Sequence, residues 1–180
     1  TVLGDLLADA PDPATVFVSN SMPVRDADRF GEPHEGALTV LGNRGASGID
    51  GIVSSGLGAG SATDDPLILA LGDVAYYHDM NGLLALARCD VDATIVLVNN
   101  DGGGIFRMLP IADFESVLEQ FETPHGLDFA PTGDLYGVEF VRTDGREAFR
   151  EAYRASLDSA GTQVIEVAFE AERSHGFREA

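Results

Sequence analysis

Short apolar runs, each ended by a turn signal, alternate along this chain with segments of helical periodicity. The apolar runs predict six strands, at residues 15–18, 38–41, 66–71, 93–98, 138–141 and 164–169. The periodic segments predict helices that run through Arg29, up to about Gly60, over 76–87, near 114–121 and over 146–157. Strands that alternate with helices are typical of α/β proteins, in which helices cover both faces of the sheet. The pattern therefore predicts a three-layer α/β fold with a mainly parallel, six-stranded sheet.

Two of the predicted strands end in polar residues that could share one site. Gly72 and Asp73 follow one of these strands, and an asparagine pair ending in Asn100 follows the next. The helix predicted over 76–87 would return the chain as a right-handed crossover, so both strands would end at the same edge of the sheet. Open α/β sheets bind ligands at this edge. We therefore expect Asp73 and Asn100 to be neighbours in space.

The residue types in these two turns suit a divalent cation and a diphosphate. Asp73 offers a carboxylate and Asn100 an amide oxygen, the hard donors that Mg²⁺ and Ca²⁺ prefer. The glycines at 102–104 would let the backbone approach a bulky anion, and a helix starting near Ile105 would direct its N–H groups at that anion. Gly-Asp and Asn-Asn-Asp-Gly are also ordinary turn sequences, so a purely structural interpretation stays open.

Composition points to one globular domain. The chain has 180 residues with 44% hydrophobic content, enough for a sizeable core. It contains no apolar stretch long enough to span a membrane and no visible signal peptide, so we expect no membrane span. The single cysteine, Cys89, excludes a disulfide framework and suggests a reducing compartment, with the cytoplasm as the expected location. We expect its thiol to be buried, on the helical crossover between the third and fourth predicted strands.

The charge of the chain is strongly acidic. The formal net charge is −19, which makes nucleic acid an improbable partner. The acidic residues are dispersed along the chain, which indicates a solvated surface that salt must screen and suggests a halophilic source. All 11 basic residues are arginine. The absence of lysine excludes a Walker A loop and a lysine Schiff base within this chain.

Several longer strings carry a more specific signal. They are NSMPVRD at 20–26, NRGASGIDG at 43–51, HDMNGL at 78–83, GGGIF at 102–106 and TPHGLDF at 123–129. With Gly72-Asp73 and Asn99-Asn100, the chain resembles the diphosphate-binding domain of thiamine-diphosphate-dependent enzymes, and most closely the synthases of the MenD type. Members of that family make 2-succinyl-5-enolpyruvyl-6-hydroxy-3-cyclohexene-1-carboxylate from 2-oxoglutarate and isochorismate in menaquinone biosynthesis. The likeness covers nearly all of this chain but only the C-terminal third of a full family member.

The resemblance implies roles for individual residues. Asp73, the side chain of Asn100 and the backbone carbonyl of Gly102 would hold Mg²⁺. Ile49 would support the bent form of thiamine diphosphate in which its reactive carbon is activated. The other implied cofactor contacts are Ser21, Ser47, Gly72, Val74, Ala75, Gly104, Ile105 and Phe106.

The resemblance also implies residues that act on the substrates. Arg25 and Arg44 would bind substrate carboxylates, because arginine presents a planar fork to a carboxylate and both substrates are dianionic acids. Ile105, Phe106 and Leu109 would form an apolar wall that protects the reacting carbon from protonation. Two structural alternatives stay open. Arg25 could form a surface ion pair with neighbouring acidic residues, and the core could contain Ile49, Ile105 and Phe106.

Two positions depart from the family pattern. Ala75 stands where a serine is usual, so one hydroxyl that could contact the diphosphate is lost. Asp101 stands where a third asparagine is common, so a negative charge is added close to the diphosphate. Either change could weaken cofactor affinity, although neither removes a metal ligand.

Family members are larger than this chain. The resemblance implies that residues 1–180 form a single C-terminal domain, while the pyrimidine-binding and central domains are absent. The pyrimidine-binding domain, normally from the other subunit, would supply the activating glutamate, so we expect this chain to be inactive alone and the full-length enzyme to be a homo-oligomer, a dimer or a tetramer. Two alternatives stay open: another thiamine-diphosphate carboligase or decarboxylase, and a non-catalytic acidic module that binds a divalent metal and a partner protein.

Overall fold

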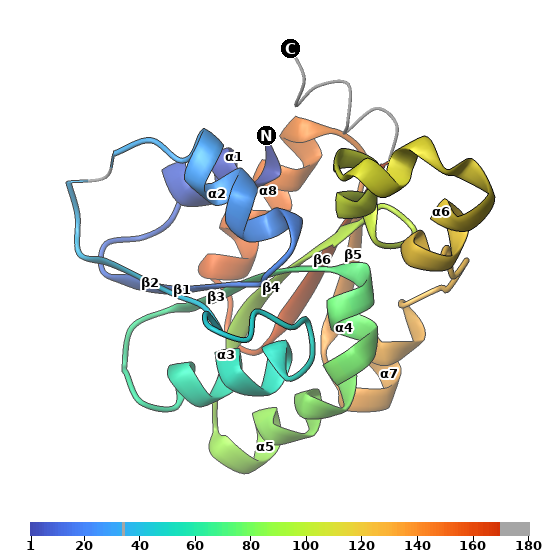
Figure 1. The fold of residues 1–180 in the computed structure, drawn as a ribbon. Helices are drawn as coiled ribbons and strands as arrows, with labels where there is room; N and C mark the ends of the chain where they lie inside the picture. Colours follow the sequence, from blue (N-terminus) through green and yellow to red (C-terminus); the bar gives the residue numbers. More distant parts are fainter. Residues whose placement is uncertain (34, 170–180) are drawn as a thin grey trace.

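The computed structural model describes residues 1–33 and 35–169, and its centre is a parallel sheet (Figure 1). Within the described residues the sheet has six strands in the order β2-β1-β3-β4-β6-β5, and every neighbouring pair is parallel. The strands are β1 (Ala14–Val18), β2 (Leu38–Leu41), β3 (Leu67–Gly72), β4 (Ala93–Asn99), β5 (Glu139–Thr143) and β6 (Gln163–Ala168). The six predicted strands and their parallel arrangement are confirmed.

Helices cover both faces of the sheet (Figure 1). One face carries α1 (Val2–Ala8), α2 (Met22–Phe30) and α8 (Arg146–Leu157), and the other carries α3 (Ile52–Gly60), α4 (Asp73–Asp79), α5 (Ala85–Cys89) and α7 (Pro131–Tyr136). The remaining elements are α6 (Glu115–Glu122) and the 3₁₀ turns η1 (Met80–Leu84), η2 (Gly104–Met108) and η3 (Pro110–Asp113). An apolar cluster fills each side of the sheet, with Phe149 and Tyr153 buried on the first face and Leu57 and Tyr76 on the second. The expected three-layer arrangement is confirmed.

Small residues bring α3 close to the sheet. A Cβ atom at Gly60 would lie 2.6 Å from the side chain of Leu67, and one at Gly56 would lie 3.0 Å from that of Leu69. Gly56 and Gly60 therefore serve close packing on β3.

The crossover between β3 and β4 is not the single helix expected over 76–87. It consists of α4, η1 and α5 in succession. A 3₁₀ turn has three residues per turn and so changes the direction in which the following side chains point. Leu84 within η1 is 61% exposed. Cys89 is exposed as well, so the expectation that its thiol is buried was wrong.

Two short helices were not expected from the sequence, namely α1 and α7. Ion pairs between two helices hold α1 against α8: Asp5 accepts two hydrogen bonds from Arg146 (2.6 and 2.9 Å), and Asp9 accepts two from Arg150 (both 2.7 Å). These contacts link residues more than 140 positions apart, so local periodicity could not reveal them.

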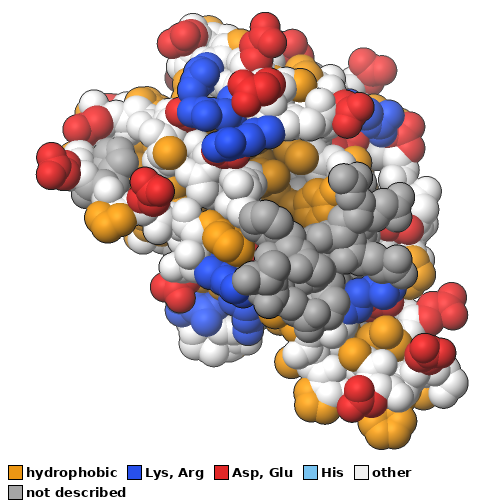
Figure 2. Space-filling view, turned by 90° about the horizontal axis from the view of Figure 1, so that it is seen from above, with side chains coloured by type: hydrophobic (Ala, Val, Ile, Leu, Met, Phe, Trp, Pro, Cys, Tyr) orange, Lys and Arg blue, Asp and Glu red, His pale blue; other side chains and the backbone are white. Residues whose placement is uncertain are grey.

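The described surface agrees with the dispersed acidity of the sequence. Figure 2 shows aspartate and glutamate side chains spread over the face in view, with arginine side chains among them. Within the described residues, no helix has the length and apolar character needed to cross a membrane.

Candidate active site

A cavity of about 620 Å³ lies at the carboxyl ends of β1, β3 and β4. The chain leaves β1 toward β2 on one side of the sheet and leaves β3 toward β4 on the other side. The connections therefore diverge between β1 and β3, and this divergence opens a crevice at the edge of the sheet. The strand order thus places the cavity where α/β proteins bind ligands.

Asp73 and Asn100 are neighbours at this edge. Asp73 begins α4 directly after β3, and Asn100 follows β4. The Oδ2 atom of Asp73 accepts hydrogen bonds from the backbone N–H groups of Asn100 (3.1 Å) and Gly102 (2.8 Å). Its Oδ1 atom accepts one from the N–H of Val74 (2.7 Å). The Asp73 carboxylate is 2% exposed, so these N–H groups replace the water it has lost and fix its position.

The three residues expected to hold a metal are adjacent, with one difference in orientation. Asn100 Nδ2 donates a hydrogen bond to the carbonyl oxygen of Gly102 (2.9 Å), so the amide nitrogen and not its oxygen faces that carbonyl. A cation between Asp73, Asn100 and Gly102 would require the Asn100 amide to turn. The donor set would then be carboxylate, amide and backbone oxygens, which fits Mg²⁺ or Ca²⁺. Within the described residues, this site included, no group of three or more His, Cys, Asp or Glu side chains could hold a metal, so the amide and backbone oxygens are needed to complete the donor set.

Gly102 and Gly103 allow close packing of the loop that follows Asn100. Gly102 has a φ of 135°, and a Cβ atom there would lie 2.4 Å from the carbonyl oxygen of Glu122. The N–H of Gly103 donates to the same carbonyl (2.7 Å). These glycines therefore let the loop pack against the end of α6. The helix expected near Ile105 is only the five-residue 3₁₀ turn η2, which is too short to present an α-helical N-terminus to an anion.

Asn20 organises another part of the cavity wall. This residue follows β1 and is 1% exposed. Its Nδ2 atom donates to the carbonyl oxygens of Asn43 and Gly48 (2.7 Å each), and its Oδ1 atom accepts a short hydrogen bond from Arg44 Nη1. The amide thereby holds the loop before α3 in place and orients the Arg44 guanidinium at the cavity.

Arg25 lines the cavity from α2. Its Nη1 atom donates to the carbonyl oxygen of Ser21 (2.6 Å). Ser21 and Ser47 also line the cavity, and both have positive φ angles, 69° and 44°. A non-glycine residue in such a conformation costs about 1–3 kcal/mol, and conformations of this kind are concentrated at functional sites.

Apolar side chains complete the wall. Ile49, Ile105 and Phe106 are half-buried and Leu109 is 43% exposed, so they line the cavity instead of filling the core. Phe106 is supported by Phe121, with ring centroids 5.5 Å apart. The other predicted contacts, Ser21, Ser47, Gly72, Val74, Ala75 and Gly104, line the same cavity. The structure therefore brings all the predicted site residues around one cavity, while their roles remain predictions.

Asp101 directs its carboxylate at a neighbouring loop. Its Oδ1 atom accepts hydrogen bonds from the backbone N–H groups of His125 (3.1 Å) and Gly126 (2.7 Å). The negative charge is therefore used to hold the loop before α7. This loop carries the TPHGLDF string, which was the only sequence signal that it belongs to the site.

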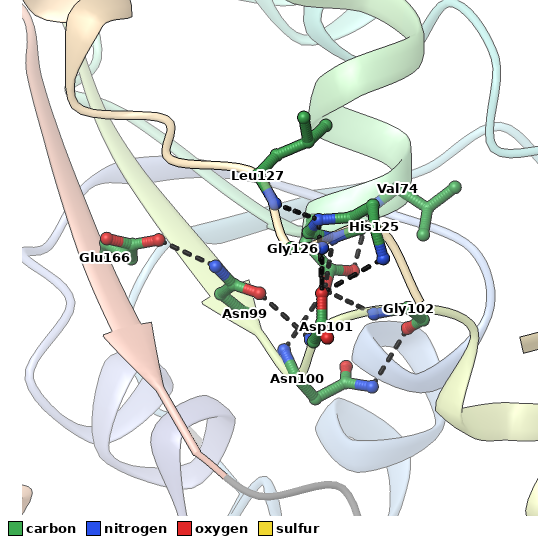
Figure 3. A network of polar contacts seen from close by, with 10 residues as sticks. Val74, Asn99, Asn100, Asp101, Gly102, His125, Gly126, Leu127 and Glu166 are labelled. Atoms are coloured by element: carbon green, nitrogen blue, oxygen red, sulfur yellow. Dashed lines mark hydrogen bonds and ion pairs between the residues drawn. The ribbon is translucent and has the colours of Figure 1, made fainter. Parts of the chain in front are cut away.

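Two further residues at the site received no role from the sequence. His125 Nε2 lies 3.2 Å from Asp73 Oδ2 (Figure 3). Ser19 Oγ is buried at the cavity wall and has no hydrogen-bond partner within residues 1–33 and 35–169. Such a hydroxyl could serve a ligand, because a buried polar group without a partner is costly. A serine directly after an apolar strand gives no signal of this in the sequence.

These features define the class of protein, a parallel α/β domain with a ligand site at the switch point of its sheet, hard oxygen donors and arginine side chains. Residues 28–167 match the family described as "Thiamine pyrophosphate enzyme, C-terminal TPP binding domain". The chain belongs to this family.

Individual proteins of high sequence identity to this chain share one name. The 2-succinyl-5-enolpyruvyl-6-hydroxy-3-cyclohexene-1-carboxylate synthases of Haloarcula marismortui and Natronomonas pharaonis are 66% and 63% identical to this chain, and each match covers 99% of the chain and 30% of the relative. The synthase of the same name from Roseiflexus castenholzii is 52% identical over 91% of the chain and 28% of the relative. The chain thus spans about 30% of the length of these curated relatives.

A solved structure shares the fold. The thiamine diphosphate-dependent 4-hydroxybenzoylformate decarboxylase of Rhodococcus jostii RHA1 superimposes with a TM-score of 0.70 at 26% sequence identity. The match covers 94% of this chain and 32% of that chain.

Proposed function

We propose that this chain is the diphosphate-binding domain of a 2-succinyl-5-enolpyruvyl-6-hydroxy-3-cyclohexene-1-carboxylate synthase of menaquinone biosynthesis, a transferase. The reaction would remove CO₂ from 2-oxoglutarate and join the remaining succinyl unit to isochorismate, with thiamine diphosphate and Mg²⁺ as cofactors. The observation that carries this proposal is that Asp73, Asn100 and Gly102 meet at one cavity that Arg25 and Arg44 also line. The high identity to proteins named as this synthase supports the assignment of the substrates.

The metal ligands in this proposal are oxygen atoms of Asp73, Asn100 and Gly102. The backbone N–H groups that donate to Asp73 hold its carboxylate before any cation arrives, which lowers the cost of ordering it on binding. When bound, thiamine diphosphate would supply the nucleophilic carbon that adds to the keto group of 2-oxoglutarate. The half-buried Ile49 would support the bent shape of the cofactor.

The chain's own residues would bind and protect the substrates. Arg25 and Arg44 are exposed at the cavity, so their guanidinium groups remain accessible to a ligand. Each could bind a substrate carboxylate through a pair of hydrogen bonds. Ile105, Phe106 and Leu109 would exclude water from the reacting carbon. Binding and orientation are thus the contributions of these side chains.

The complete enzyme would need more than this domain. We propose that the pyrimidine-binding domain of another subunit closes the site and that the full-length enzyme is a homo-oligomer, a dimer or a tetramer. The net charge of −19 supports a salt-rich setting, because self-repulsion of such a surface falls when salt screens it. The exposed thiol of Cys89 supports a reducing location such as the cytoplasm.

Binding of cofactor and metal tests the proposal directly. In the enzyme that contains this chain, calorimetry should detect thiamine diphosphate binding that requires Mg²⁺, and Asp73→Ala should abolish it. Arg44→Met is the matched variant, because it should keep cofactor binding while raising the KM for 2-oxoglutarate by at least about tenfold. Cofactor binding that is unaffected by Asp73→Ala would contradict the proposed metal site. Turnover of a 2-oxo acid other than 2-oxoglutarate would instead support a different carboligase or decarboxylase.

A further inference from the structure

We propose that Glu166, a buried carboxylate on β6, is a positioning residue that holds the metal-binding turn through the side chain of Asn99. The inference deepens the proposed function and rests on it for the role of the turn in binding Mg²⁺. Glu166 is 3% exposed and lies outside the cavity. The proposed reaction does not use this buried charge, so its presence is explained by its contacts within the protein.

Glu166 has partners on both neighbouring strands. β6 lies between β4 and β5, so Glu166 is in register with Leu97 on one side and with Arg142 on the other. Its Oε1 atom accepts a hydrogen bond from Asn99 Nδ2 (2.8 Å), and its Oε2 atom accepts one from Arg142 Nε (2.6 Å). A buried carboxylate is stable only when it is paired and hydrogen-bonded, and here both oxygens are used.

The first of these contacts determines how the Asn99 amide is oriented. An ionised carboxylate can only accept hydrogen bonds, so the NH₂ group of Asn99 must face Glu166. The carbonyl end of the same amide, Oδ1, then faces the next turn and accepts a hydrogen bond from the backbone N–H of Asp101 (3.0 Å). Glu166 therefore decides which end of the Asn99 side chain meets the Asp101 backbone.

The contact to Asp101 matters because this residue has an unfavourable backbone conformation. Its φ is 59°, in the left-handed region that a non-glycine residue adopts at a cost. A side-chain oxygen that accepts from the N–H two residues later is the standard way in which asparagine stabilises such a turn. Without the Asn99 acceptor, the turn at Asp101 would lose this support.

The turn at Asp101 fixes the positions of the predicted metal ligands. Directly after Asp101, Gly102 donates its N–H to Asp73 Oδ2 (2.8 Å), and its carbonyl oxygen accepts from Asn100 Nδ2 (2.9 Å). Figure 3 shows the resulting path, from Glu166 on its strand through Asn99 to the turn. Three successive hydrogen bonds thus connect Glu166 to the carboxylate of Asp73.

A purely structural role predicts something different. If Glu166 served only as the partner of Arg142, removing either residue would lower global stability and leave the turn unchanged. Arg142 is 54% exposed and also pairs with Asp128, so it is not confined to Glu166. Arg142→Gln is therefore the matched control, because it removes the ion pair and keeps the contact between Glu166 and Asn99.

Four variants of the enzyme that contains this chain test the inference. Glu166→Leu and Asn99→Ala each break the path, and the second keeps the carboxylate and its ion pair with Arg142. Glu166→Gln keeps an acceptor for Asn99 and should rescue the turn, and Arg142→Gln should leave it intact. The first measurement is amide hydrogen exchange over residues 99–104 without metal or cofactor, and the second is the Mg²⁺ concentration for half-maximal activity.

The expected results separate the two roles. Glu166→Leu and Asn99→Ala should speed exchange over residues 99–104 by at least about fivefold and raise the half-maximal Mg²⁺ concentration by about fivefold to tenfold. The KM for 2-oxoglutarate should change by less than about twofold, because no substrate contact is removed. Unchanged exchange in both variants, or equal effects from Arg142→Gln, would overturn the inference. If the wild-type enzyme needed no Mg²⁺, the proposed function would fail, whereas faster exchange in the variants would still establish the path from Glu166 to the turn.

Discussion

His125 Nε2 lies 3.2 Å from the Oδ2 atom of Asp73, although 52 residues separate the two in the chain. The backbone N–H of Leu127 donates to His125 Nδ1 (3.0 Å), which leaves Nε2 as the ring nitrogen that can donate to the carboxylate. Asp73 thus has a ring nitrogen from the loop before α7 beside it, in addition to the N–H donors of Val74 in the first turn of α4 and of the turn after β4. The loop that carries His125 is part of the support of the predicted metal site.

We expect His125→Ala to weaken Mg²⁺ binding, because a residue that donates to a metal-binding carboxylate fixes its orientation. The half-maximal Mg²⁺ concentration should rise by about fivefold, and His125→Gln, whose amide can still donate, should recover much of the loss. Titration of activity with Mg²⁺ at saturating thiamine diphosphate measures this effect. An unchanged Mg²⁺ dependence in His125→Ala would show that the contact does not serve the site.

Gly102 should not tolerate a side chain. Its φ is 135°, and a Cβ atom there would lie 2.4 Å from the carbonyl oxygen of Glu122, so both the backbone and the available space oppose a substitution. Gly102→Ala should lower the free energy of unfolding by about 1–3 kcal/mol. Gly58→Ala is the control, because Gly58 has open space around its Cβ position within α3 and should gain up to about 1 kcal/mol. Denaturant unfolding of both variants compares the two glycines, and equal effects would refute this explanation.

Asn20 should matter for substrate binding through Arg44. Asn20→Ala removes the acceptor that orients the Arg44 guanidinium and the two donors that hold its loop. The KM for 2-oxoglutarate should therefore rise by about tenfold, with a smaller change in kcat. Asn43 lies in the same loop, and its amide donates to Ser55 Oγ and not to Arg44. Asn43→Ala should therefore leave the KM close to that of the wild type. Steady-state kinetics that showed the same KM for both variants would contradict the positioning role of Asn20.

The ion pairs between α1 and α8 should make stability depend on pH in the acidic range. Hydrogen bonds from Arg146 and Arg150 hold the pKa of Asp5 and the pKa of Asp9, respectively, below the value of a free aspartate. Because both pKa values are lower in the folded state, this stabilisation is complete above the unfolded-state pKa of about 4 and is lost as the pH falls through the folded-state values.

Replacing Asp9 by asparagine should therefore reduce the dependence of stability on pH in the acidic range. The melting temperature of Asp9→Asn should lie below that of the wild type at pH 6, and the difference should shrink as the pH falls below about 4. Asp64→Asn removes an equal charge from an exposed position and should keep the wild-type slope. A constant difference between Asp9→Asn and the wild type at all pH values would argue against the pairing with Arg150.

The sequence alone determined the elements that depend on neighbouring residues. The apolar runs that became β3 and β4 are local patterns, and so is the periodicity that became α8. The handedness of the crossover then sufficed to predict that Asp73 and Asn100 would meet, because a right-handed crossover leaves few other arrangements. The resemblance of short strings to a family added residues such as Arg44 and Ile49, which no periodicity would have singled out.

Only the tertiary structure decided features that depend on segments far apart. The placement of β6 between β4 and β5 brings Glu166 to Asn99, and the loop before α7 brings His125 to Asp73. The exposure of Cys89 likewise follows from the break in its helix. The physical reason is that periodicity and turn chemistry are properties of a few adjacent residues, whereas strand order and side-chain contacts depend on packing summed over the whole chain.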